Sequence, residues 1–118
     1  MHMPAPGMFT GSSLLLVLLA GHALADFALQ NSFMTEGKNR HTTIGRVWWP
    51  YAVTAHALIH GGIVAVLTGS TTLGLAELTV HWLTDFLKCE RRISLHTDQA
   101  IHIACKLLWF LLAASGHR

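Results

Sequence analysis

The sequence contains little charge. Lys, Arg, Asp and Glu together make up 12% of its 118 residues, and the formal net charge is +2. A water-soluble domain of this size usually carries about twice that charged fraction. The chain also lacks a run of Lys or Arg and a stripe of alternating basic and aromatic residues. No nucleic-acid partner is therefore expected.

Cysteine is equally scarce. The chain has two cysteines, Cys89 and Cys105, which are far apart and form no CxxC motif. This pattern predicts neither a disulfide framework nor a cysteine zinc site. Both residues are expected to be small apolar side chains at or near helix ends.

Apolar residues, in contrast, are abundant. They make up 52% of the chain, and the mean hydropathy is +0.44. Four apolar segments alternate with short polar connections, and each is close to the ~20 residues that a bilayer-spanning helix needs. We therefore predict an all-α fold, an integral membrane four-helix bundle with up-down-up-down topology and a buried His/Asp cluster, formed as one domain by residues 1–118. The expected helices cover residues 13–30, 48–67, 72–88 and 96–114.

Two kinds of residue refine this bundle. Residues 69–72 (GSTT) predict a tight turn that makes the second and third helices antiparallel neighbours. Small residues within apolar helices predict close helix contacts, and these glycines are Gly21, Gly61, Gly62 and Gly74.

The basic residues predict the orientation. Six of the eight Lys and Arg residues lie in or beside the two connections 31–47 and 88–95. Basic connections favour the cytoplasmic side of a membrane. We therefore expect these two loops to be cytoplasmic and both termini to lie on the outer, periplasmic face.

Histidine is the most informative residue type. The chain contains nine histidines, and with the aspartates they form pairs separated by four positions, one in each apolar segment. Such spacing stacks two side chains on one face of a helix. Random placement would give roughly one such pair in the whole chain. The pairs are His22 and Asp26, His56 and His60, His81 and Asp85, and Asp98 and His102.

The bundle topology predicts that the four pairs meet. The ends of the first and third helices and the starts of the second and fourth lie on the same side of an up-down-up-down bundle. Ionisable groups at a helix centre in lipid cost about 3 kcal/mol each, which a shared divalent cation offsets. Imidazoles and carboxylates together favour Zn²⁺, with Mn²⁺ or Fe²⁺ as alternatives. All eight paired residues are predicted ligands of one or two ions.

Other roles for the pairs remain open. Each pair alone could be a polar clasp between membrane helices, and histidines in a bundle also bind haem. Glu77 and Lys106 continue two of the rows by another turn. They are expected to pair with each other deeper in the bundle, or Glu77 accepts a proton.

Four segments of the chain resemble a known but uncharacterised family. The segments HALADFALQ, HALIHG, HWLTDFLK and DQAIH resemble a domain of unknown function found in small bacterial and phage inner-membrane proteins. That family is similar in its His-x3-Asp pattern to proteins thought to be membrane-bound metal-dependent hydrolases. The resemblance implies a location in the bacterial inner membrane, the eight paired residues as ligands, and hydrolysis of a phosphoester.

The leading functional hypothesis is a membrane-embedded zinc-dependent hydrolase. It would act on an ester or phosphoester in a lipid-like or membrane-proximal substrate, with membrane lipid as a partner and oligomerisation left open. A bound metal lowers the pKa of its water to about 7, and Asp26 or Asp98 would orient that water or act as the base. Basic residues of the two loops would bind an anionic head group, unless they serve only as topology signals. These are Lys38, Arg40, Arg91 and Arg92.

Two alternatives belong to other classes. A metal-ion or proton transporter or channel could use the same His/Asp cluster as a relay. Such a relay should cross the whole bilayer, whereas the pairs gather on one side. The second alternative is a phage or bacterial membrane interaction protein with a structural metal, which would lack an open coordination position.

The first apolar segment also resembles a signal peptide. Its LLLVLLAGHALA stretch, which begins at Leu14, imitates an apolar core with an A-x-A cleavage site. No Lys or Arg precedes it, although signal peptides have a positive N-terminal region. Cleavage after Ala25 would separate His22 from Asp26, so we expect this helix to remain uncleaved.

Overall fold

The computed structural model describes residues 9–116, and in this range the chain forms only helices and their connections. The all-α prediction is confirmed. Both chain termini, which were predicted to be periplasmic, lie outside the described range. The helical elements are α1 (Gly11–Ala23), the π-helical segment η1 (Leu24–Ala28), α2 (Ser32–Gly37), α3 (Gly45–Thr68), α4 (Thr71–Cys89) and α5 (Leu95–Ala114).

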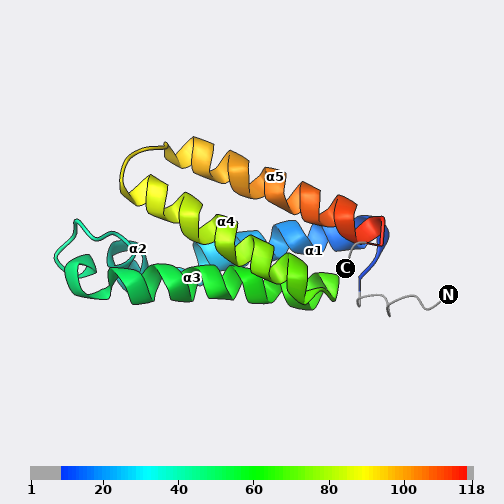
Figure 1. Ribbon diagram of the computed structural model, residues 1–118, viewed down its shortest axis with the longest axis horizontal. Helices are drawn as coiled ribbons and strands as arrows, with labels where there is room; N and C mark the ends of the chain where they lie inside the picture. The colour runs from blue at the N-terminus through cyan, green and yellow to red at the C-terminus, as the bar shows by residue number, and fades with distance from the viewer. Residues whose placement is uncertain (1–8, 117–118) are drawn as a thin grey trace.

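The long helices run alternately in opposite directions (Figure 1). The start of α1, the turn between α3 and α4, and the end of α5 lie at one end of the molecule. The loop between α4 and α5 and the short helix α2 lie at the other end, which we call the loop end. Gly69, with a φ of 71°, ends α3, and the Ser70 side chain accepts from the Leu73 amide at 3.1 Å to begin α4. The predicted tight turn is therefore present.

The predicted count of four helices is wrong, because the described part of the chain contains five α-helices. The additional helix, α2, lies in the segment 31–47 that was predicted to be a loop. The Asn31 side chain accepts from the Met34 amide at 2.9 Å and so caps its first turn. With six residues, α2 is too short to produce a helical hydrophobic period in the sequence.

Two described helical segments are long and apolar enough to cross a membrane. They are Gly11–Ala28, formed by α1 and η1, and Gly45–Thr68, formed by α3. Helices α4 and α5 are of similar length, but the charged side chains Glu77, Asp85, Asp98 and Lys106 lie within them. The described part of the chain therefore has two candidate spans, α1 with η1 and α3.

An apolar core fills the end of the bundle opposite the loops. Its members come from four helices and are Leu14, Leu18, Val64, Leu73, Trp109 and Ala113. The buried polar side chains of the predicted pairs lie on the loop side of this core. They occupy the last turn of α1, η1, the middle of α3, the second half of α4 and the first half of α5. The core therefore separates the predicted cluster from the other end of the bundle.

Three of the four predicted glycine contacts are real. A Cβ added to Gly61 would lie 2.7 Å from the Gly74 carbonyl oxygen, and one added to Gly74 would lie 2.6 Å from the Ala65 Cβ. A Cβ added to Gly21 would lie 2.7 Å from the Ile63 Cγ2. The prediction for Gly62 is wrong, because nothing lies within 4 Å of its added Cβ.

This difference gives a matched pair of variants. We expect Gly61→Ala to lower the free energy of unfolding by about 1–3 kcal/mol, because the methyl group forces α3 away from the α4 backbone. Gly62→Ala, on the same helix, should be neutral or slightly stabilising because alanine favours helix over glycine. Thermal unfolding followed by circular dichroism in detergent measures both. Equal melting temperatures for the two variants would contradict the close approach at Gly61.

Candidate metal centre

All eight predicted ligands lie in one buried cluster. Each of the eight residues is at most 6% exposed. Their imidazole rings lie against one another, with ring centroids 3.6 Å apart for His60 and His81 and 4.0 Å apart for His81 and His102. The predicted meeting of the four pairs at one depth is therefore observed, and their role as ligands stays a prediction.

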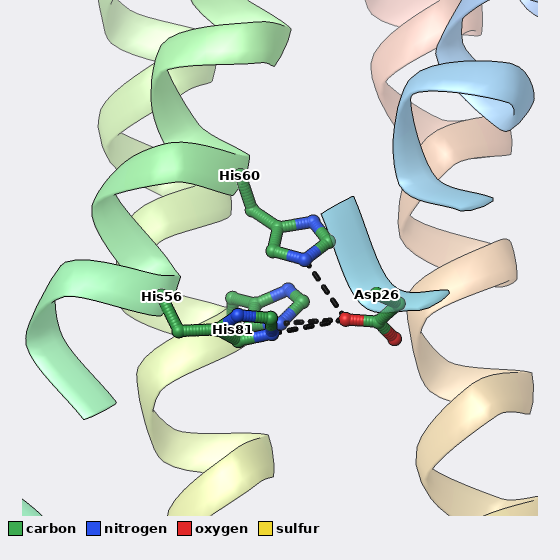
Figure 2. A group of neighbouring side chains, drawn as sticks. All are labelled: Asp26, His56, His60 and His81. Atoms are coloured by element: carbon green, nitrogen blue, oxygen red, sulfur yellow. Dashed lines mark hydrogen bonds and ion pairs between the residues drawn. The ribbon is translucent and has the colours of Figure 1, made fainter. Parts of the chain in front are cut away.

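Four of these residues point toward one another and form a compact group (Figure 2). The Asp26 Oδ1 lies 3.0 Å from His56 Nε2, 2.8 Å from His60 Nε2 and 3.7 Å from His81 Nε2. All four ligand atoms lie within 4.8 Å of one another. Ligands at 2.0–2.1 Å from a tetrahedral zinc ion are roughly 3.3 Å apart. Three imidazoles and one carboxylate at this spacing fit a zinc ion, and we call this group the first site.

A second feature supports the first site. The buried Nε2 of His81, which faces Asp26, has no hydrogen-bond partner. The other ring nitrogen, Nδ1, donates to Glu77 Oε2 at 3.2 Å. A carboxylate that accepts from one imidazole nitrogen fixes the tautomer in which the other nitrogen has a free lone pair. In the neutral ring, this hydrogen bond would leave the Nε2 lone pair of His81 available to a metal ion.

Glu77 is itself held by a buried network. The Lys106 ammonium and the Trp109 indole both donate to Glu77 Oε1, the indole at 3.1 Å. The pairing of Glu77 with Lys106 that the sequence predicted is confirmed. The sequence placed Glu77 one turn before His81 in the same row, but it did not predict the hydrogen bond between them.

Asp85 lies beside the first site but is shared with two lysines. Its Oδ2 lies 3.5 Å from both His56 Nε2 and His81 Nε2. The same oxygen is 3.2 Å from Lys38 Nζ, and Oδ1 is 3.1 Å from Lys88 Nζ. Two ammonium groups therefore neutralise Asp85 at the loop end of the cluster.

The remaining predicted ligands form a group on the α1 and α5 side. His102 Nε2 lies 3.1 Å from Asp98 Oδ1, and His22 Nε2 lies 3.6 Å from Asp26 Oδ2. Ligand atoms of Asp26, Asp98 and His102 lie within 4.8 Å of one another. Gln99 also belongs to this group, since its side chain contacts His22, Asp26 and Asp98. Sequence reasoning missed Gln99 because a single uncharged amide in a helix carries no signal.

The π-helical segment η1 explains how Asp26 reaches across the bundle. Asp26 lies inside η1, where the helix is wider than an α-helix. The spacing of His22 and Asp26 predicted that they act as a pair on one α-helical face. The two side chains do lie together, with His22 Nε2 3.6 Å from Asp26 Oδ2. In addition, Asp26 Oδ1 contacts α3, and His22 Nε2 contacts Gln99 Oε1 of α5 at 3.0 Å.

Of the four predicted substrate-binding residues, Lys38 alone contacts the cluster in the described part of the chain. Its side chain is buried against Asp85 although it follows directly on α2. Arg40 instead pairs with Glu90, and Arg91 and Arg92 are exposed on the loop before α5. These three arginines lie outside the buried cluster, and their predicted binding of an anionic head group stays a prediction. Lys88 contacts Asp85 and was not predicted.

The two basic loops contact each other outside the cluster. Arg40 and His41 both contact the Glu90 carboxylate, and the hydrogen bond from Arg40 holds the pKa of Glu90 below its usual value. A pocket of about 330 Å³ lies beside this contact. It is lined by Asn39, His41, Cys89, Glu90 and Arg91. The loops predicted to share one side of the membrane thus lie together.

Fold and site define a class: an all-helical protein with His and Asp side chains gathered at metal-ligand spacing in its interior. The particular family follows from comparison. The chain belongs to the family described as a protein of unknown function (DUF3307), which matches residues 14–116. The predicted membership of an uncharacterised family is confirmed. No curated protein and no solved structure matches the chain.

Proposed function

We propose that this protein is a membrane-embedded, zinc-dependent hydrolase that acts on an ester or phosphoester in a lipid-like or membrane-proximal substrate. The observation that carries the proposal is the first site, in which Asp26 and three imidazoles converge at the spacing of zinc ligands. Glu77 supports it by fixing the tautomer of His81. Mn²⁺ and Fe²⁺ are the alternative ions, since both also take imidazole and carboxylate ligands.

The distribution of side chains supports a membrane location. Large apolar residues cover the outside, with Leu16 67% exposed and Val66 75% exposed, while charged groups fill the interior. Water-soluble domains usually show the reverse arrangement, whereas lipid favours it. We therefore propose that the four long helices all span the bacterial inner membrane, with loops 31–47 and 88–95 cytoplasmic and both termini periplasmic.

Reporter fusions test this orientation. Alkaline phosphatase fused after Arg118 should be active, because that enzyme folds in the periplasm, and green fluorescent protein at the same position should be dark. The opposite pattern would place the C-terminus in the cytoplasm and overturn the topology.

Each residue around the first site would have a different role in the reaction. A bound zinc ion supplies a water of lowered pKa and a positive charge beside the reacting oxygen. Asp26 and Asp98 are the carboxylates that would orient this water and accept its proton. Lys38 and Lys88 approach Asp85 from the loop end, where they would hold the anionic oxygens of a substrate that enters from that side.

Hydrolysis requires a direct test. Detergent-purified protein should release product from at least one member of a panel of phospholipids and prenyl phosphates, and a chelator should abolish the release. Water supplies the attacking oxygen, the phosphoester P–O bond breaks, and the leaving oxygen gains a proton. If no substrate is cleaved but reconstituted vesicles take up zinc, the transporter alternative replaces the hydrolase.

The apolar core weighs against a transporter. Glu77, Lys106 and Trp109 continue the polar side chains only as far as this core, in which Leu14, Leu18 and Val64 are almost completely buried. The structural-metal alternative has one observation in its favour. Four protein ligands would fill a tetrahedral ion, whereas catalytic zinc usually keeps one position for water.

A further inference from the structure

Asp26 uses its two carboxylate oxygens in opposite directions. Its Oδ1 faces the imidazoles of α3 and α4, at 3.0 Å from His56 and 2.8 Å from His60. Its Oδ2 faces α5 and the preceding turn of α1, at 2.8 Å from the Gln99 amide nitrogen and 3.6 Å from His22 Nε2. One carboxylate therefore links two sets of predicted ligands.

The side chains around Asp26 Oδ2 include both carboxylates and imidazoles, the two kinds of ligand expected here. Asp98 contributes a carboxylate, and His102 and His22 contribute imidazoles. His102 and Asp98 are almost fully buried and His22 is 5% exposed. These side chains come from α1 and α5, so they occupy a different place from His56 and His60 of α3. His102 also stacks on His81 of the first site at 4.0 Å, which makes the two sets direct neighbours.

Gln99 marks the centre of the second set. Its side-chain nitrogen donates to Asp26 Oδ2 at 2.8 Å and to Asp98 Oδ2 at 3.2 Å, and its Oε1 lies 3.0 Å from His22 Nε2. An amide N–H carries partial positive charge, so two buried carboxylates here favour a positive group between them. If the half-buried Gln99 side chain turns aside, a divalent cation can bind the same two carboxylates, and it binds them more strongly than the amide does.

We infer that the cluster binds a second divalent cation, held by Asp26 Oδ2, Asp98 and His102 with His22 beside them, so that Asp26 bridges two ions. This inference rests on the proposed metal-dependent hydrolase and deepens it. A pair of ions stabilises both the attacking and the leaving oxygen of a phosphoester. The second site would have three protein ligands, Asp26, Asp98 and His102, and would therefore keep a position for water, which the four ligands of the first site do not.

The charges of the cluster indicate which class of substrate a centre with two ions would bind. Four carboxylates and three ammonium groups lie in or against it, so its own charge is close to zero. They are Asp26, Glu77, Asp85, Asp98, Lys38, Lys88 and Lys106. Two divalent ions would leave a large positive excess in a buried place. An anionic phosphoester offsets that excess, whereas a neutral carboxylic ester does not.

Metal stoichiometry tests the second ion. Wild-type protein loaded with Zn²⁺ in detergent, and freed of excess ion, should contain two equivalents by elemental analysis. Asp98→Asn should retain one, with the second bound at least about tenfold more weakly, and should lose phosphoester release. Glu36→Gln, an exposed acid on α2, is the matched control and should retain two.

A second variant and a spectroscopic measurement guard against misfolding of Asp98→Asn. Gln99→Ala removes no predicted ligand, so it should retain two equivalents and bind the second more tightly than wild type. Protein loaded with Mn²⁺ should give the electron paramagnetic resonance spectrum of two coupled ions, because a shared carboxylate couples them. Two uncoupled signals would contradict the bridging role of Asp26.

The outcomes separate this inference from the proposed function. One equivalent in wild type with chelator-sensitive hydrolysis overturns the second ion and leaves the hydrolase standing. Two coupled equivalents without cleavage of any phospholipid or prenyl phosphate support the second ion and overturn the hydrolase. Absence of bound metal from wild type overturns both.

Discussion

Replacing His56 with alanine should remove metal from the first site. Wild-type protein is expected to retain at least about one equivalent of zinc after purification and reconstitution, as buried structural and catalytic zinc sites do. His56 contributes one of the four atoms that surround the proposed ion, and its Nε2 lies 3.0 Å from Asp26. Loss of a direct ligand should weaken zinc binding by more than the about 10–100-fold that follows loss of a supporting hydrogen bond.

His96→Ala is the matched control. His96 lies in the first turn of α5 and is exposed, so its removal should leave the zinc content unchanged. Elemental analysis and competition with a chromogenic chelator give the content and the affinity of all three proteins. Less than about a tenth of an equivalent of zinc, manganese or iron in wild type would contradict the metal site, because ligands this buried bind too tightly for that.

The sequence was sufficient to predict the cluster because helical geometry leaves little freedom. A spacing of four positions fixes two side chains on one face, and alternating helix directions fix which ends meet. The antiparallel packing of α3 and α4 therefore had to bring His56 close to His81, and their rings are 5.1 Å apart. Neither step depends on side-chain packing, which cannot be obtained from one sequence.

How the ligands are divided could not be predicted. His22 and Asp26 lie together as the sequence suggested, with His22 Nε2 3.6 Å from Asp26 Oδ2. The sequence did not show that Asp26, in the π-helical turn, also contacts α3, or that His22 contacts Gln99. A π-helical turn contains an extra residue, and it forms where tertiary contacts offset the free-energy cost of that residue. The hydrophobic pattern does not contain that information, since LADFA is equally compatible with an α-helix.

The position of Lys38 was beyond the sequence. Lys38 follows a helix of six residues within a connection, and its place depends on how that connection folds back. Loops lack the periodicity that predicts the helices. Lys88 is different, because it lies in the last turn of α4, three positions after Asp85, and contacts it at 3.1 Å. Helical spacing alone would have predicted that contact, but Lys88 was interpreted only as a topology signal.

Replacing Glu77 with glutamine should destabilise the protein strongly. Glu77 is 0% exposed, and its partner Lys106 is 1% exposed. Removing one member of a buried ion pair leaves an uncompensated charge, which typically costs about 3–5 kcal/mol. Glu77→Gln should therefore lower the melting temperature by more than Gly61→Ala does, as measured by circular dichroism in the same detergent.

The double variant Glu77→Gln with Lys106→Met separates the ion pair from the metal site. Methionine has a similar length and no charge, and replacement of a whole buried pair by neutral groups is often neutral or stabilising. The double variant should therefore regain most of the lost stability. If it is no more stable than Glu77→Gln alone, the buried charge of Lys106 is not the cause of the loss.

Zinc affinity should not recover together with stability. Glutamine can accept from His81 Nδ1 through its amide oxygen, but without the negative charge that raises the basicity of the opposite nitrogen. The stable double variant should consequently bind zinc about 10–100-fold more weakly than wild type, the range for loss of a supporting carboxylate. A purely structural role for Glu77 predicts instead that affinity returns with the melting temperature. Comparing the two measurements on the same protein decides whether the carboxylate acts through His81.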